Sequence, residues 1–114
     1  MDVLRISYTG KVELVEFDGE YPAIKQIREW IGDDCRYAEH VSVYWYDPLG
    51  GVTRRMSMWV DEEFLLKLMD GKGAPMNMWA TMLYQQGSLI GGLMDQAAQC
   101  VIHGNAVLTT KPAP

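Results

Sequence analysis

Two β-prone runs near the middle of the chain constrain its fold more than any other feature. Residues 37–46 and residues 52–60 are rich in β-branched and aromatic side chains, and residues 47–51 between them, Asp-Pro-Leu-Gly-Gly, have the composition of a turn. This arrangement predicts an antiparallel hairpin. Alternation along the first strand places Val41, Val43 and Trp45 on one face and Ser42, Tyr44 and Tyr46 on the other. Along the second strand, one face carries Arg54, Met56 and Met58, and the other carries Arg55, Ser57 and Trp59.

A second hairpin and a helix are predicted before these runs. Residues 3–8 and 11–17 are two further β-prone runs around Thr9-Gly10, and we expect Val12, Leu14 and Phe17 to point inward. Residues 20–31 have helical periodicity, with Pro22 in the first turn and Gly32 as the C-terminal cap. The apolar face of this helix consists of Tyr21, Ile24, Ile27, Trp30 and Ile31.

The second half of the chain is predicted to be mainly helical before a last strand. A short helix over 61–71 would begin at Asp61 and carry the stripe Phe64, Leu65, Leu68 and Met69. A loop follows over residues 70–75. We then expect a helix over 78–86 with Trp79, Met82 and Leu83 facing the core, a helix over 89–99 capped by Ser88, and a strand over 100–109.

These elements predict an α+β fold. The expected sheet is mixed and mostly antiparallel, with about five strands. Helix 20–31 would cover one face of it, and the helices over 78–99 would lie on the other face or at an edge. A chain of 114 residues is near the common size for one core, so we expect a single domain over 1–110 and a flexible tail over 111–114.

Charge and hydrophobicity exclude several classes of function. The chain has 15 acidic and 10 basic residues, a net charge of −5, and no basic run, so nucleic-acid binding is disfavoured. The acids are scattered along the sequence, which is typical of solubilising charge. No apolar run is long enough to span a membrane, and residues 1–5 do not resemble the start of a signal peptide. We therefore expect a cytoplasmic protein.

Metal and nucleophile chemistry are the sharpest chemical alternatives. Cys35, His40, Cys100 and His103 are zinc-ligand types in the right number. The two pairs have odd separations, however, and on extended chain an odd separation points side chains to opposite faces. No orienting third group accompanies a Cys–His pair. We therefore predict no metal, no cofactor and no catalytic residue, and expect both cysteines to be inert thiols.

Aromatic and methionine content favours an interface. Four Trp, six Tyr and eight Met exceed what one small core can hide, and residues 44–59 hold many of them. One reading is that a face of the hairpin stays exposed for a partner. The other reading is that helices cover both faces of the hairpin. A homodimer formed through the hairpin would be compatible with either reading. The partner-contacting residues would be Tyr44, Tyr46, Met56, Met58 and Trp59.

One segment resembles a known family. The block Asn-Met-Trp-Ala-Thr-Met-Leu-Tyr at 77–84, with the glycine-containing final strand at 102–108, is similar to small phage- and mobile-element-encoded proteins grouped as a domain of unknown function. The matched positions are Asn77, Ala80, Thr81, Leu83, Tyr84 and Gly104. The chain departs from the family at Phe64, where a glycine is usual and would favour a turn into a strand, and in extra sequence at 71–74 and 87–98. The resemblance implies a phage or mobile-element origin, where small proteins often bind a host factor.

The leading functional hypothesis is therefore a non-enzymatic accessory protein that binds and modulates a host protein. The alternative is a protein that binds or sequesters a small ligand, such as a nucleotide signal used in host defence. Its polar groups would be Asn77, Thr81, Tyr84, His103 and Asn105. Each of these five also suits a structural role in a cap, a turn or the core. In particular, we predict that Asn77 caps helix 78–86 and that Tyr84 packs against the final strand near Gly104.

Overall fold

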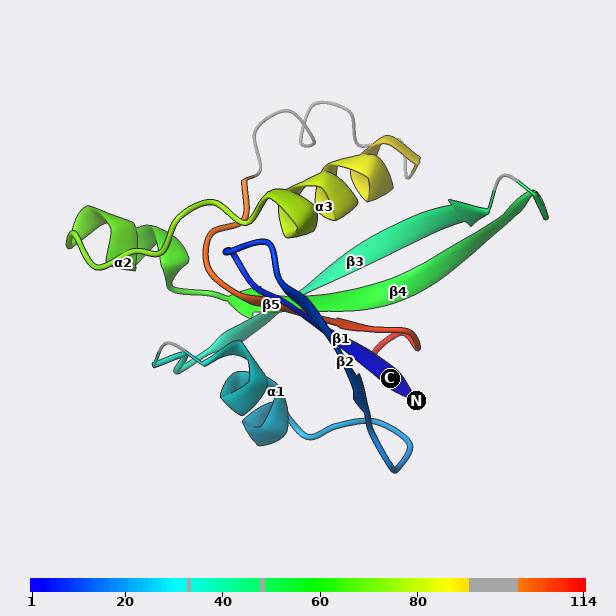
Figure 1. The fold of residues 1–114 in the computed structure, drawn as a ribbon, viewed down its shortest axis with the longest axis horizontal. Coiled ribbons are helices and arrows are strands. Elements are labelled where there is room, and N and C mark those ends of the chain that lie inside the picture. Colours follow the sequence, from blue (N-terminus) through cyan, green and yellow to red (C-terminus); the bar gives the residue numbers. More distant parts are fainter. Residues whose placement is uncertain (33, 48, 91–100) are drawn as a thin grey trace.

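The protein is a five-stranded antiparallel sheet with a helix on each face, which confirms the predicted α+β class. The computed structural model describes residues 1–32, 34–47, 49–90 and 101–114. The strand order is β2-β1-β5-β4-β3, so the last strand lies at the centre (Figure 1). The elements are β1 (Asp2–Ile6), β2 (Val12–Glu16), α1 (Ile24–Ile31), β3 (Ala38–Asp47), β4 (Val52–Asp61), α2 (Phe64–Met69), α3 (Met78–Ile90) and β5 (Ala106–Thr109).

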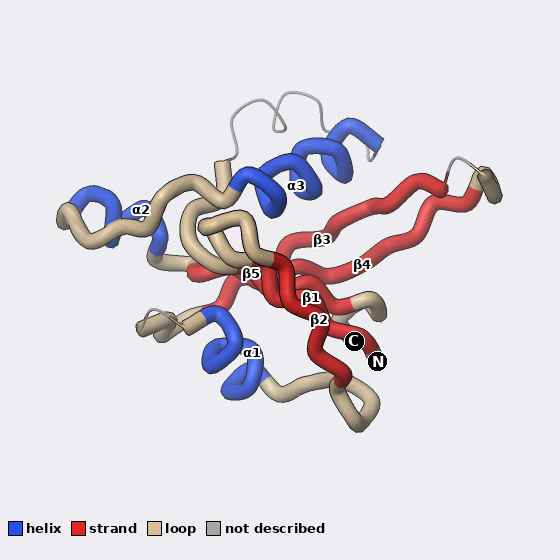
Figure 2. Tube along the Cα trace, viewed as in Figure 1, coloured by secondary structure: helices blue, strands red, loops and turns tan. Residues whose placement is uncertain are grey.

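Two apolar clusters fill the space between the sheet and its helices. The larger cluster, under α3, includes Ile6, Val43, Met58, Ala80 and Leu108. The smaller cluster, under α1, is centred on Val3, Ile27, Ile31 and Val107. The side chains of successive strand residues therefore enter different clusters, as the alternation of a strand requires. Figure 2 shows α1 and α3 on opposite sides of the sheet and the β3–β4 hairpin projecting beyond both.

The first hairpin has the predicted strands, but the residues of its second strand that were expected to point inward are exposed. Val12 and Leu14 are paired with Ile6 and Leu4 and lie on the α3 face, where they are 48% and 63% exposed. The prediction that they point inward is wrong because β2 is the sheet edge and α3 lies over the other end of the sheet (Figure 1). Val15 packs against the cluster under α1 instead, and Phe17 joins it as predicted.

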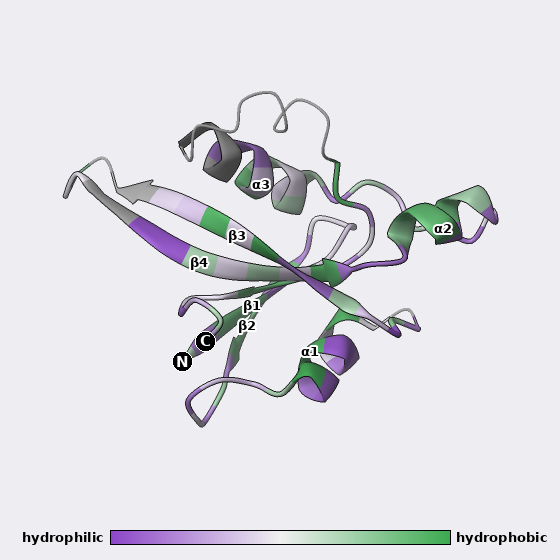
Figure 3. Ribbon diagram, turned by 180° about the vertical axis from the view of Figure 1, so that it is seen from behind, coloured by the Kyte–Doolittle hydropathy of each residue, from purple (hydrophilic) through white to green (hydrophobic). Residues whose placement is uncertain are grey.

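Helix α1 begins later than predicted. It spans Ile24–Ile31 rather than 20–31, because Ala23 is extended with ψ of 154° and Pro22 precedes this cap. The residue before a proline is also disfavoured in helical geometry. Gly32 closes the helix with φ of +69°, as predicted. Ile27 and Ile31 are buried, but Ile24 is exposed. In Figure 3 the outward side of α1 is hydrophilic and its inward side hydrophobic.

The central hairpin agrees with the prediction. Strands β3 and β4 pair in one continuous antiparallel register from Ala38 opposite Asp61 to Asp47 opposite Val52. Met56 and Met58 face the cluster under α3, and Trp59 faces the cluster under α1. Helices therefore cover both faces of the inner half of the hairpin, while the outer half projects as an arm.

The helices after β4 differ from the prediction in length and rotation. Helix α2 is confirmed, although shorter than 61–71. Helix α3 continues without a break to Ile90, so a separate helix capped by Ser88 is wrong, and residues 91–99 of that helix lie outside the described chain. Trp79 and Met82 are 52% and 53% exposed instead of facing the core. Small Ala80 and Thr81 are buried in their place, which lets the helix approach the sheet closely, and Leu83 packs there as predicted.

The final strand is shorter than 100–109. Before β5, Met76 and His103 form an isolated antiparallel bridge, and Gly104 has φ of +79°. A β-carbon on Gly104 would lie 3.7 Å from the Ala74 methyl group. Tyr84 packs against the larger cluster, which includes Ile102, Ala106 and Leu108. The prediction is wrong only in placing it beside Gly104, because the side chain nearest to that β-carbon is Ala74. After β5, the backbone N–H of Ala113 donates to Ser57 Oγ at 2.7 Å, within the segment predicted as a tail.

Candidate functional site

Asn77 joins three segments of the core. Its side-chain Oδ1 accepts from the N–H of Ala80 at 3.1 Å, which confirms the predicted N-cap. Its Nδ2 donates to the carbonyls of Ile6 and Gly104 at 2.8 and 2.9 Å, and its backbone N–H donates to Ile102 at 2.7 Å. The residue is fully buried. All the polar atoms of its side chain are thus used in holding α3, β1 and the β5 loop together.

Thr81 continues this structural role one turn along α3. Its Oγ1 accepts from the backbone N–H of Ile102 at 2.9 Å and lies 3.4 Å from the carbonyl of the same residue. The hydroxyl is buried, so it substitutes for a strand partner that the loop would otherwise lack. Of the five polar residues proposed for ligand binding, Asn77 and Thr81 therefore lie in the core, whereas Tyr84, His103 and Asn105 line cavities.

The five hairpin residues proposed for partner contact are also divided by the fold. Met58 is fully buried, and Met56 and Trp59 are partly buried. Trp59 Nε1 donates to the Tyr21 hydroxyl at 2.9 Å, and that oxygen lies 3.0 Å from Thr109 Oγ1. Tyr44 lies on the projecting arm and is half-buried, while the side chain of Tyr46 lies outside the described part of the structure. Tyr44 is therefore the member of this set best placed to meet a partner.

Strand β3 is an edge of the sheet, and one side of it has no neighbouring strand among the described residues. The N–H of Glu62 donates to the carbonyl of Tyr37 at 2.9 Å, and the two residues are in register. In an antiparallel pair, hydrogen-bonded and non-bonded positions alternate, so odd-numbered β3 residues bond to β4. The N–H and C=O groups of even-numbered residues point outward: Ala38, His40, Ser42, Tyr44 and Tyr46. No other described strand bonds to them.

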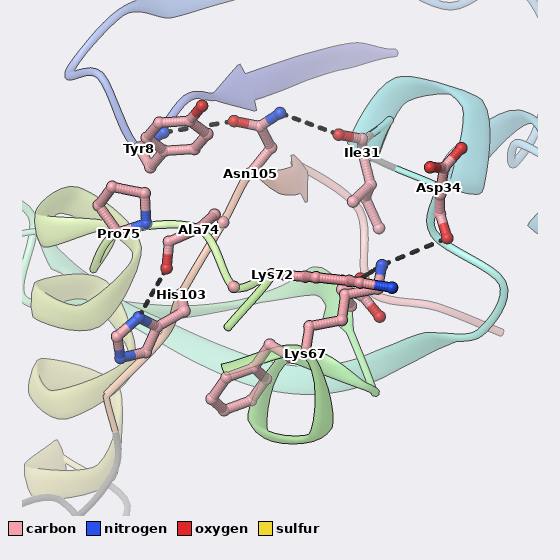
Figure 4. Close-up of a pocket in the computed structure, with 13 residues that line it drawn as sticks. Tyr8, Ile31, Asp34, Lys67, Lys72, Ala74, Pro75, His103 and Asn105 are labelled. Atoms are coloured by element: carbon pink, nitrogen blue, oxygen red, sulfur yellow. Dashed lines mark hydrogen bonds and ion pairs between the residues drawn. The ribbon is translucent and has the colours of Figure 1, made fainter. Parts of the chain in front are cut away.

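A polar cavity of about 360 Å³ lies between α2, the 72–75 loop and the end of α1 (Figure 4). Lys67 crosses its floor, with Nζ 2.6 Å from Asp61 Oδ2 and 3.2 Å from the carbonyl of Asp34. Burial lowers the pKa of Lys67, but the hydrogen bond and charge of Asp61 outweigh this and raise it overall. Lys72 is exposed and points across the cavity in Figure 4. Lys67 is thus paired with the Asp61 carboxylate, while Asp34 contacts it through a backbone carbonyl.

His103 and Asn105 form one wall of this polar cavity, as the ligand-binding alternative required. Asn105 Nδ2 donates to the carbonyl of Ile31 at 3.0 Å, and its Oδ1 accepts from the N–H of Tyr8 at 3.3 Å. His103 Nδ1 lies 3.0 Å from the carbonyl of Ala74. Because a carbonyl only accepts, Nδ1 carries the proton, and in the neutral ring Nε2 is an acceptor.

A second cavity, of about 350 Å³, has mainly apolar walls. We call it the apolar cavity. It lies on the α3 face of the sheet, where it shares the stacked pair Phe64 and His103 with the polar cavity, the two ring centroids being 5.8 Å apart. Its remaining walls are Glu39, Val41, Val60, Leu65, Tyr84, Val101 and Ile102. Glu39 and Val41 belong to β3, so this cavity adjoins the unpaired edge.

The two histidines considered as zinc ligands have other partners. His40 Nε2 lies 2.7 Å from Ser57 Oγ, and His103 bonds to Ala74. Burial, followed by the charge of Arg55, lowers the pKa of His40 below its ordinary 6.5. Among the described residues, no three His, Cys, Asp or Glu side chains gather in a way that could hold a metal ion. Cys100 lies outside that part of the chain.

Cys35 should react slowly with thiol reagents. Burial and, secondarily, the charge of Asp61 raise its pKa from 9.0 to about 11, so at pH 8 it should carry about a hundredfold less thiolate than an unperturbed thiol. We expect Cys35 in a Cys100→Ser variant to react with Ellman's reagent far more slowly when folded than in urea. Equal rates in the two states would contradict the burial argument.

Several residues of these cavities were not found from the sequence. Phe64 and Leu65 were assigned only to an apolar stripe, and Leu65 is 61% exposed and lines the apolar cavity. Lys67, Lys72 and Glu39 carried no motif. The sequence gives a positional signal only for Lys67. It lies six residues after Asp61, and the two side chains form an ion pair.

Comparisons with family models, with curated proteins and with solved structures found no match for the chain. The resemblance of residues 77–84 and 102–108 to the phage family therefore stays a prediction. In the described part of the structure, no helix is both long and apolar enough to cross a membrane.

Proposed function

We propose that the chain is a non-enzymatic accessory protein, of phage or mobile-element origin, that binds and modulates a host protein through the free edge of β3. The observation that carries the proposal is the row of outward N–H and C=O groups from Ala38 to Tyr46. Such an edge is a template on which another chain adds a strand, with backbone hydrogen bonds supplying affinity. The origin rests only on the resemblance of residues 77–84 and 102–108.

The two edges of the sheet differ in ways that favour β3. Strand β2 has five residues, contains Glu13 and Glu16 and follows Lys11, and charges of this kind protect edges from pairing. Strand β3 has ten residues, and its only charged residues are Glu39 and the terminal Asp47, apart from His40. Trp45 is also exposed on the same arm. Aromatic side chains of this kind are enriched where proteins bind one another.

Replacing Ser42 with proline tests this proposal. The N–H of Ser42 points away from β4, so proline removes a donor from the free edge without breaking the β3–β4 ladder. We expect Ser42→Pro to fold and to lose partners that the wild-type chain captures from a host lysate. Ser42→Ala is the matched control, because it removes the hydroxyl but keeps the N–H, and it should capture the same partners.

The same variants decide whether the edge pairs with a second copy. A homodimer through β3 would use the same outward groups, so sedimentation should show a dimer for wild type and Ser42→Ala and a monomer for Ser42→Pro. Identical captured proteins from wild type and Ser42→Pro would place the contact elsewhere on the chain.

The second candidate function is small-ligand binding in the polar cavity, favoured by the presence of His103 and Asn105 in its wall. A nucleotide signal would need cationic groups, but Lys67 is already paired with Asp61, and Asp34 belongs to the same lining as Lys72. Thermal unfolding with a panel of nucleotides tests it. A ligand at a hundredfold over its Kd adds about 2.7 kcal/mol to stability. The effect should be weaker in Lys72→Ala, and no stabilisation by any nucleotide would remove this candidate.

A further inference from the structure

We propose that the segment bound by β3 is an extended peptide that inserts a large apolar side chain into the apolar cavity and places a basic side chain beside Glu39. This inference rests on the proposed function, because it specifies the partner of the same edge. It goes further by assigning the chemistry that distinguishes one strand-forming peptide from another.

Strand geometry connects the edge to the cavity. Val41 and Glu39 line the apolar cavity, and the outward backbone groups of His40 and Ser42 lie on either side of Val41 along the edge. An added antiparallel strand that bonds to His40 and Ser42 has a residue directly opposite Val41 in a non-bonded pair, with the α-carbons about 4.5 Å apart. Its side chain points to the same face as that of Val41. That face is the one with the cavity.

The walls of the cavity determine what this side chain must be. Val60, Phe64, Leu65 and Tyr84 present carbon from β4, α2 and α3, and the volume of about 350 Å³ is at the lower end of the range for ligand sites. In Figure 3 the ribbon of α2 is coloured hydrophobic along most of its length. A Phe, Leu, Met or Trp side chain fits such walls, whereas an acidic side chain would lose its hydration there and lie close to the like charge of Glu39.

The charge of Glu39 sets a second requirement for the peptide. Glu39 is exposed, lies two residues before Val41 on the same face of β3, and has no ion-pair partner within the described ranges. The whole chain carries a net charge of −5. A Lys or Arg two positions along the peptide from its apolar anchor would lie opposite Glu39. Opposite charges in such cross-strand positions are favourable, and like charges are unfavourable.

The edge alone would accept almost any extended chain. Domains that bind peptides by strand addition obtain specificity from pockets for alternate side chains of the peptide, because the backbone bonds are the same for all sequences. The combination of one apolar anchor and one basic residue therefore defines the partner as a short motif in an unstructured or terminal segment rather than as a folded surface.

The experiment selects, from a display library of short random peptides, those that bind the immobilised full-length wild-type chain. Peptides that also bind Ser42→Pro are removed. Synthetic copies of the remaining peptides are then titrated by fluorescence anisotropy. We expect a shared apolar residue and a Lys or Arg two positions from it. Methylating the peptide backbone nitrogens that face β3 should abolish binding, whereas methylating the alternate nitrogens should not.

Two exposed leucines of α2 provide a matched pair of variants. Leu65 is 61% exposed and lines the cavity, and Leu66 is 58% exposed and does not. We expect Leu65→Asp to weaken peptide binding about tenfold or more and Leu66→Asp to leave it unchanged. Glu39→Lys should weaken the selected peptides and strengthen versions in which the basic residue is replaced by Glu.

The outcomes separate the two proposals. Peptides that need the Ser42 N–H but bind equally to Leu65→Asp and Glu39→Lys would overturn the inference about the motif while supporting the edge. Peptides that bind Ser42→Pro as well as wild type would overturn both. If no peptide is selected although Ser42→Pro abolishes capture of a host protein, the partner is a folded surface, and the inference of an extended motif is wrong.

Discussion

Replacing Asn77 with alanine should lower the free energy of unfolding by about 3 to 5 kcal/mol. Loss of the N-cap to Ala80 contributes about 1 kcal/mol. The larger part comes from the two bonds of Nδ2 to the carbonyls of Ile6 and Gly104, because losing such a donor in a fully buried site costs about 1 to 2 kcal/mol for each bond. This is a large part of the stability of an ordinary domain. Urea unfolding followed by tryptophan fluorescence measures it.

Asn77→Ser separates the two contributions. Serine is a good N-cap, but its shorter side chain has one donor and cannot replace the two bonds of Nδ2. We expect it to recover only about 1 kcal/mol of the loss. If Asn77→Ser were as stable as wild type, the cap alone would explain the residue and the core connection would be unimportant. A fully stable Asn77→Ala that loses biological effect would instead place Asn77 in the functional site.

The sequence predicted the parts of this fold that depend on local chemistry. The alternation in residues 37–60 predicted the hairpin and its two faces. Gly32 gave the end of α1, and Asn77 gave the start of α3, since a cap and a left-handed glycine are decided within a few residues. The fold class followed from the order of these elements.

What the sequence did not predict depends on contacts between distant segments. Trp79 was assigned to the core by its hydrophobicity, but the helix turns Ala80 and Thr81 toward the sheet because Asn77 and Thr81 bond to β1 and the β5 loop. Leu14 was assigned inward by alternation, but nothing in its neighbourhood in the sequence shows that β2 is an edge. Local periodicity indicates which residues share a face, but it does not say which face another element covers.

The candidate sites were harder still to predict. His103 and Asn105 were named for their polarity and do line a cavity, yet the residues opposite them, Lys67 and Lys72, come from a helix and a loop with no motif. The unpaired groups of β3 cannot be seen in a sequence at all. They depend on strand order and on which residues of the hairpin are hydrogen-bonded, and both are properties of the assembled sheet.

Replacing Met58 with alanine should destabilise the protein by about 2 to 5 kcal/mol, the range found when a large buried side chain is truncated. Met58 is fully buried among Val43, Val60, Ala80 and Leu108, so the truncation leaves a cavity in the larger cluster. Tyr44→Ala, on the half-buried arm of the same hairpin, should cost much less stability. Thermal unfolding of the two variants measures the difference.

Met58→Leu tests whether this methionine acts by volume or by contact with a partner. Leucine nearly conserves volume, so it should cost less than about 1.5 kcal/mol, and partner capture should be unchanged. Loss of capture by a stable Met58→Leu would show that the methionine reaches the partner, which its burial under α3 does not allow. Tyr44→Ala should show the opposite pattern, because a residue beside the free edge contributes to binding without supporting the core. The same hairpin would then supply stability with one face and recognition with its outer edge.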